Sequence, residues 1–132
     1  MPMINFVAVL AAAVAGWLVG AVWYGVLGKV WMDAAGIVCP EGKRPMPIGP
    51  MVLALVAQLI IALMLAGLMG HMGPRDIPRG IVSGVLVWFG FVLTTLAVNN
   101  AFQGKKPMLT VIDGGHWLAV LVVQGIIFGL FG

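Results

Sequence analysis

Four long apolar stretches fill almost all of this 132-residue chain and limit what it can fold into. A helix needs about 20 mostly apolar residues to cross the hydrocarbon core of a bilayer, and each stretch reaches that length. Charged residues make up only 8% of the chain and lie almost entirely in the short connectors. We therefore expect a single all-α membrane domain with four transmembrane helices, at about 3–28, 48–70, 81–101 and 108–131.

A fold built from strands does not fit these stretches. Their apolar residues are continuous, whereas membrane strands alternate apolar and polar positions. The composition also excludes an ordinary soluble domain, since 62% of residues are hydrophobic and the mean hydropathy is +1.13. Seven basic residues divided between two membrane faces form no patch for nucleic acid.

The loop charges predict how the chain is oriented. Five Lys or Arg residues follow the first and third spans, and two follow the second. By the positive-inside rule, the first and third connectors are cytoplasmic, and both termini are periplasmic in a bacterial inner membrane. We expect the first span to be retained, because it lacks the positive n-region of a signal peptide and exceeds its length. The two groups are Lys29, Lys43, Arg44, Lys105 and Lys106, and Arg75 and Arg79.

The connector after the first span has a pattern of its own. Apolar residues in Gly28–Ile37 recur at helical spacing, which predicts a short interfacial helix with Trp31 at headgroup depth. The residues on this face are Val30, Trp31, Ala34 and Ile37. Cys39 is the only cysteine, so neither an intrachain disulfide nor a cysteine-based metal motif is expected.

The two halves of the chain resemble each other. With a shift of 76 residues, 21–32 matches 97–108 at Ala, Val, Gly, Lys and Met, and with a shift of 66, Gln58 falls on Gln124. This pattern favours a duplicated helical hairpin with a pseudo-twofold axis along the membrane normal, as in parallel-repeat transporters. We expect both glutamines to hydrogen-bond between helices, and one option is a bond to each other.

Three G-x-x-x-G pairs predict close helix packing. Small residues at this spacing let helix backbones approach, either within one chain or between chains. Four helices must pack against one another, which favours contacts within the chain. The pairs are Gly16 and Gly20, Gly80 and Gly84, and Gly125 and Gly129.

Polar and aromatic residues gather at the predicted cytoplasmic side, where they form a candidate site. Asp113 and His116 are three residues apart on one helix face, a spacing that can hydrogen-bond or supply two metal ligands. Thr110 and Asp113 also resemble a capping box. Capping with a bond to Asn99, ligand or proton handling, and metal binding all stay open, and no metal or cofactor is assigned. The candidates are Trp23, Tyr24, Asn99, Asn100, Asp113, His116 and Trp117.

Segments 20–24, 28–32, 98–99 and 112–117 resemble the domain of unknown function 1761 family of small bacterial membrane proteins. The resemblance covers essentially the whole chain and implies four helices without an established activity. The matching positions are Trp23, Tyr24, Gly28, Trp31, Asn99, Asp113 and Trp117. The family pattern commonly has an aromatic residue where His116 and Asn100 stand. This departure counts against a metal or proton role that depends on His116.

Three classes of function remain. The first is a transport or permeation unit for a small solute, acting as a homo-oligomer with Tyr24, Asn99 and Asp113 in a cytoplasmic vestibule. The second is a structural or regulatory module that binds membrane lipid or a partner helix through its glycine faces. The third, an interfacial lipid enzyme using Asp113 and His116, lacks a nucleophile or metal set, so an enzyme is not expected. No carboxylate or arginine lies at mid-membrane, which argues against a proton-coupled multidrug exporter.

Overall fold

The computed structural model describes residues 4–38 and 47–131, and every regular element in these ranges is helical. Four helices are long and apolar enough to span a membrane, because α3, η1 and α4 form one continuous segment. The predicted all-α, four-span fold class is thus confirmed. Cys39, Lys43 and Arg44 lie outside the described residues. The elements are α1 (Phe6–Ala35), α2 (Ile48–His71), α3 (Ile77–Val87), the π-helical η1 (Trp88–Leu93), α4 (Thr94–Phe102) and α5 (Pro107–Leu130).

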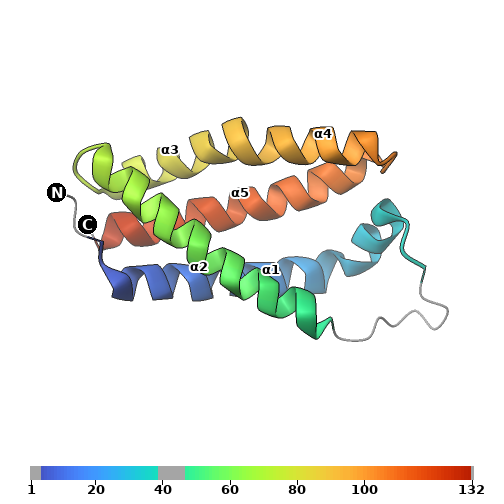
Figure 1. Ribbon diagram of the computed structural model, residues 1–132, viewed down its shortest axis with the longest axis horizontal. Helices are drawn as coiled ribbons and strands as arrows, with labels where there is room; N and C mark the ends of the chain where they lie inside the picture. Colours follow the sequence, from blue (N-terminus) through green and yellow to red (C-terminus); the bar gives the residue numbers. More distant parts are fainter. Residues whose placement is uncertain (1–3, 39–46, 132) are drawn as a thin grey trace.

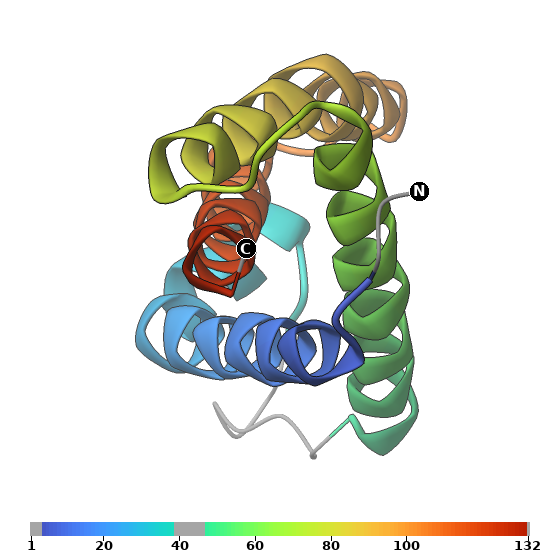
Figure 2. The ribbon, with the colours of Figure 1, turned by 90° about the vertical axis from the view of Figure 1, so that its left-hand side faces the viewer.

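Helix α5 is the centre of the bundle. It packs along α1 on one side and along α3 on the other, while α2 crosses the bundle and packs mainly on α1 (Figures 1 and 2). Helix α1 begins and helix α5 ends at the same end of the bundle as the α2–α3 turn, and we call this the termini end (Figure 1). The opposite end, with the α4–α5 turn and Lys105 and Lys106, is called the lysine end.

The packing does not follow the predicted pseudo-twofold symmetry. A strict duplication would make the α1–α5 contact equivalent to the α3–α2 contact. Instead α5 packs extensively on α1, whereas α2 touches α3 and α5 only sparingly. The physical reason lies in the glycines, because α3 and α5 share a glycine-rich face, whereas Gly49 and Gly67 of α2 face open space.

The predicted interfacial helix after the first span is wrong as a separate element. Helix α1 continues without interruption to Ala35, because no residue between Gly28 and Ala35 breaks a helix. It ends at Gly36, whose φ of 75° is the left-handed conformation of a helix C-cap. The last turn of α1 packs against the start of α5, where Ala34 and Ala35 form a buried cluster with two α5 residues, Leu109 and Ile112.

The third span contains one irregular segment, the π-helical η1. Two threonines follow it, and their hydroxyls donate hydrogen bonds to carbonyls of the same helix. Thr94 donates to the Gly90 carbonyl at 3.0 Å, and Thr95 donates to the Phe91 carbonyl at 2.7 Å. These bonds satisfy polar groups on an exposed, apolar helix. Segments of this kind often occur at functional sites.

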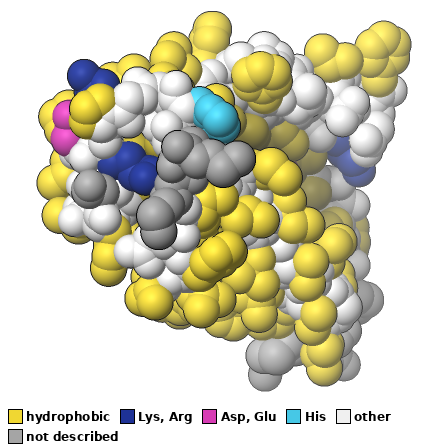
Figure 3. Space-filling view, turned by 60° about the vertical axis from the view of Figure 1, so that its left-hand side comes forward, with side chains coloured by type: hydrophobic (Ala, Val, Ile, Leu, Met, Phe, Trp, Pro, Cys, Tyr) yellow, Lys and Arg dark blue, Asp and Glu magenta, His cyan; other side chains and the backbone are white. Residues whose placement is uncertain are grey.

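The outer surface is mostly apolar, as expected for helices in lipid. Large aliphatic and aromatic side chains are exposed along all four spans. Figure 3 shows hydrophobic side chains covering the flank of the molecule, with only a few charged groups. Helix α5 is by far the most buried span, and α3–η1–α4 is the least.

Candidate functional site

The lysine end brings together a carboxyl group and a phenol from two spans. The Tyr24 hydroxyl on α1 donates a hydrogen bond to Oδ1 of Asp113 on α5, at 2.5 Å. Both side chains are partly buried between the helices. An ionisable residue inside a membrane helix is costly, so its partner is part of why it is tolerated.

Aromatic rings surround this pair. The Trp31 side chain also hydrogen-bonds Asp113, and its ring meets Tyr24 edge-on with the centroids 5.7 Å apart. The Trp31 ring therefore lies against the Tyr24–Asp113 pair, and its position at headgroup depth stays a prediction. The His116 ring also lies near Tyr24, with the centroids 5.0 Å apart, and Trp117 packs edge-on against His116 at 4.6 Å.

His116 does not pair with Asp113 as the three-residue spacing suggested. Its side chain is only 6% exposed, and Nε2 lies over Gly20 of α1. A Cβ at Gly20 would stand 3.0 Å from that nitrogen, so the glycine leaves the room for the imidazole. Within the described part of the chain, Nδ1 of His116 is buried and has no hydrogen-bond partner.

The two glutamines meet at the centre of the bundle. Nε2 of Gln124 donates to Oε1 of Gln58 at 2.8 Å and to the Ala12 carbonyl at 3.3 Å. Both side chains are fully buried. Gly16 makes space for them, since a Cβ there would be 2.3 Å from Oε1 of Gln58. Oε1 of Gln124 is buried with no partner among the residues that the structure describes.

These contacts form a continuous series along the α1–α5 contact. Three contacts follow one another along these helices: Asp113 with Tyr24, His116 with Gly20, and Gln124 with Gly16. Successive residues are three to eight positions apart, so they stay on one face of each helix. We call this series, together with Gln58 of α2, the polar seam. It runs from the lysine end to the middle of the bundle.

The G-x-x-x-G pairs divide into two kinds. Gly16 and Gly20 accommodate polar side chains, not a neighbouring backbone. The α3–α5 glycines do bring backbones together, because a Cβ at Gly80 would be 1.9 Å from the Gly125 carbonyl oxygen and one at Gly84 2.6 Å from the Leu121 oxygen. Gly129 meets the Asp76 carbonyl in the same way.

Two expectations about Asp113 are wrong. Asn99 is exposed on α4, and the Asp113 carboxyl group accepts hydrogen bonds from Tyr24 and Trp31 instead. Asp113 is not a cap either, because Pro107 begins α5 well before it. Thr110 accepts a bond from Nδ2 of Asn100 at 3.1 Å, which joins α4 to α5.

Sequence reasoning missed how the backbone of α5 is used. The indoles of Trp23 and Trp88 donate to the carbonyls of Ile112 and Gly114, at 3.0 and 2.7 Å. Trp23 lies directly over Gly115, where a Cβ would be 2.8 Å from its ring. The Gly114-Gly115 pair in the sequence could have indicated these contacts, because residues without side chains leave helix carbonyls accessible.

The charged residues of the lysine end join the helices from outside the seam. Nζ of Lys105 donates to the Ala35 carbonyl at 2.9 Å, near the end of α1. Lys106 forms an ion pair with Asp33 at 3.1 Å, and both side chains are mostly exposed. No group of three His, Cys, Asp or Glu side chains able to hold a metal ion occurs in residues 4–38 and 47–131.

One comparison with known proteins finds a match over nearly the whole chain. A family model described as "Protein of unknown function (DUF1761)" matches residues 7–129, nearly the whole chain. The chain belongs to this family. No curated protein and no solved structure matches it. The function of the DUF1761 family is unknown.

Proposed function

We propose that this protein is a transport or permeation unit for a small hydrogen-bonding solute, and that the polar seam is its binding path. One observation supports this most directly: two buried polar atoms on one face of α5, Nδ1 of His116 and Oε1 of Gln124, have no partner in the described chain. Buried polar groups that serve only to hold helices together are nearly always paired. The two unpaired atoms lie on the same helix as Asp113, and a solute that binds there could supply the missing hydrogen bonds.

The proposal includes a homo-oligomer in a bacterial inner membrane with the lysine end in the cytoplasm. Helix α2 has few contacts with α3 and α5, and its outer residues Leu53, Val56 and Ile60 are exposed. A second copy of the chain can pack on that face. The molar mass of the purified protein in a mild detergent tests this part, and a monomer would contradict it.

The test of transport is the flux into vesicles that contain the protein. Osmotic swelling followed by light scattering, with glycerol, urea and ammonium as probes, should be faster than in vesicles without protein for at least one probe. Asp113→Asn keeps an oxygen that can accept from Tyr24 but removes the charge, and Gln124→Leu removes the unpaired oxygen. Both should slow the flux.

Thr95→Val is the matched control, because that hydroxyl only bonds its own helix. Transport is refuted if no probe enters faster than in vesicles without protein, or if the control slows the flux as much as the seam variants.

A structural or regulatory membrane module is the second candidate. The bond between Tyr24 and Asp113 joins residues 89 positions apart and clamps α1 to α5, as a purely structural contact would. This candidate predicts no flux for any probe. It also predicts that Tyr24→Phe lowers the free energy of unfolding by about 1–3 kcal/mol, because Asp113 would lose its phenol donor.

A further inference from the structure

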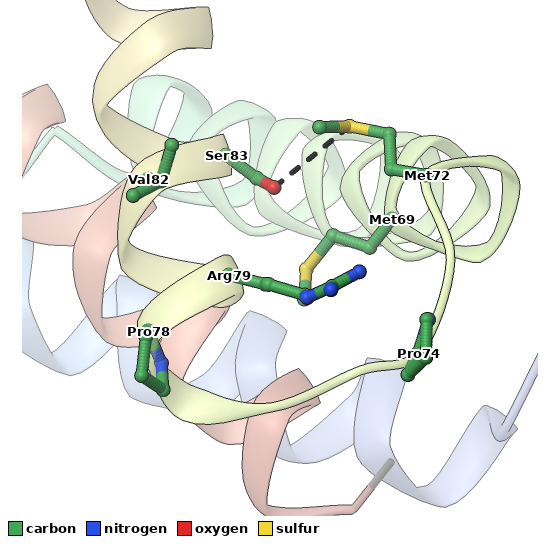
Figure 4. A pocket seen from close by; sticks show the side chains of 7 residues that line it. All are labelled: Met69, Met72, Pro74, Pro78, Arg79, Val82 and Ser83. Atoms are coloured by element: carbon green, nitrogen blue, oxygen red, sulfur yellow. Dashed lines mark hydrogen bonds between the residues drawn. The ribbon is translucent and has the colours of Figure 1, made fainter.

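A pocket at the termini end is separate from the polar seam. It lies between the end of α2 and the start of α3 and encloses about 260 Å³ (Figure 4). Its walls are mostly apolar, with Met69 from α2, Met72 and Pro74 from the connecting segment, and Pro78 and Val82 from α3. Methionine side chains are flexible and polarisable, so such walls adapt to an irregular apolar chain.

One cation reaches across this pocket. The Arg79 side chain extends from the first turn of α3 toward Met69 (Figure 4). Nε of Arg79 lies 3.4 Å from Oδ2 of Asp76, an exposed pair that orients the guanidinium. The α2–α3 turn leaves room for the guanidinium at Gly73, where a Cβ would be 2.9 Å from Nη1 of Arg79. Gly73 has a φ of 108°, a conformation open to glycine.

The pocket also holds one buried hydroxyl. Ser83 is only 2% exposed, and its Oγ lies 3.9 Å from the sulfur of Met72, a weak acceptor. The nearby Arg75 is used elsewhere, because it donates to the Ala66 carbonyl at 3.1 Å. Arg79 is therefore the cation that the pocket offers to a ligand.

We propose that this pocket binds an anionic phospholipid, with the phosphate on the Arg79 guanidinium and the beginning of an acyl chain against the methionines. The ligand must combine a negative oxygen cluster with an apolar chain, because the pocket combines a guanidinium with apolar walls. Guanidinium groups bind phosphate through paired N–H donors. The position also fits, since the pocket is at the end of two apolar spans, where headgroups lie.

The test is native mass spectrometry of the purified protein with phosphatidylglycerol, phosphatidylcholine or inorganic phosphate added. The intact protein should retain phosphatidylglycerol in preference to the other two. Arg79→Gln should weaken that retention about fivefold, the effect of one cation near an anionic membrane surface. Its backbone N–H still reaches the Asp76 cap, so the start of α3 is kept. Val82→Trp, which fills the pocket, should also reduce retention.

Lys29→Gln is the control, because it removes one exposed positive charge far from the pocket. The proposal is overturned if Arg79→Gln retains as much phosphatidylglycerol as the unchanged protein, or if Lys29→Gln loses as much. Equal retention of phosphatidylcholine would show a groove without headgroup selectivity and would overturn the proposal. In a further outcome, inorganic phosphate competes with the lipid only when Arg79 is present, and Val82→Trp has no effect. This would show an anion site that does not hold a lipid chain, and it also overturns the proposal.

Discussion

The contact between α3 and α5 is tightest at Gly80 and Gly125, which makes Gly80→Ala an informative change. A Cβ at Gly80 would stand 1.9 Å from the carbonyl oxygen of Gly125 and 2.5 Å from its carbon. Ordinary contact begins at 3.4 Å, so the two helices would have to separate locally by about 1.5 Å. The atoms in the way belong to the backbone, so no flexible side chain can give way.

The size of the effect follows from two opposing terms. Overpacking typically costs about 1–3 kcal/mol, and a rigid backbone contact belongs at the upper end of that range. Alanine in place of glycine favours the helix by about 1 kcal/mol. We therefore expect Gly80→Ala to lower the free energy of unfolding by about 2 kcal/mol.

Gly25→Ala is the matched control, because a Cβ at Gly25 meets nothing within 4 Å. This change should leave stability unchanged or raise it by up to about 1 kcal/mol. The assay is reversible unfolding in mixed micelles with increasing dodecyl sulfate, followed by tryptophan fluorescence and circular dichroism. The reasoning is refuted if Gly80→Ala is as stable as Gly25→Ala. An altered oligomer mass with unchanged unfolding would place the glycine contact between chains.

Two further changes separate buried polar contacts from exposed ones. Gln58→Leu removes the acceptor for Nε2 of Gln124 and should lower the free energy of unfolding by about 1 kcal/mol in the same assay, whereas an unchanged value would mean that the pair adds nothing to stability. Lys106→Gln breaks the exposed ion pair with Asp33 and should change the free energy of unfolding by less than about 1 kcal/mol. The effect should be smaller at high salt, and a larger loss that does not depend on salt would contradict this interpretation.

Several local features could be predicted because they depend on neighbouring residues. The start of α5 is one of them, because the expected fourth span begins at 108 and the helix begins at Pro107. The end of α1 was misjudged because Gly28 and Lys29 resembled a boundary, although a single glycine inside a helix is tolerated. Only the packing of Ala34 and Ala35 on α5 shows that the helix continues.

The partners within the candidate site were harder to predict. Asp113 could be recognised as unusual from its place in an apolar span, but its donors Tyr24 and Trp31 lie more than 80 residues earlier. The sequence suggested Asn99 because it is near in the chain. Helix crossing and rotation decide the outcome, and they turn Asn99 to the outside.

The sequence by itself determined that the chain has four apolar helical spans, because length and hydropathy are local properties that each stretch carries alone. Only the tertiary structure decided that α5 is central, that Gly16 and Gly20 receive polar side chains, and that Gly80 and Gly125 join two backbones. The physical reason is that lipid is as apolar as the interior of the bundle. Hydrophobic periodicity therefore does not mark the buried face of a membrane helix, and shape and hydrogen bonding select it.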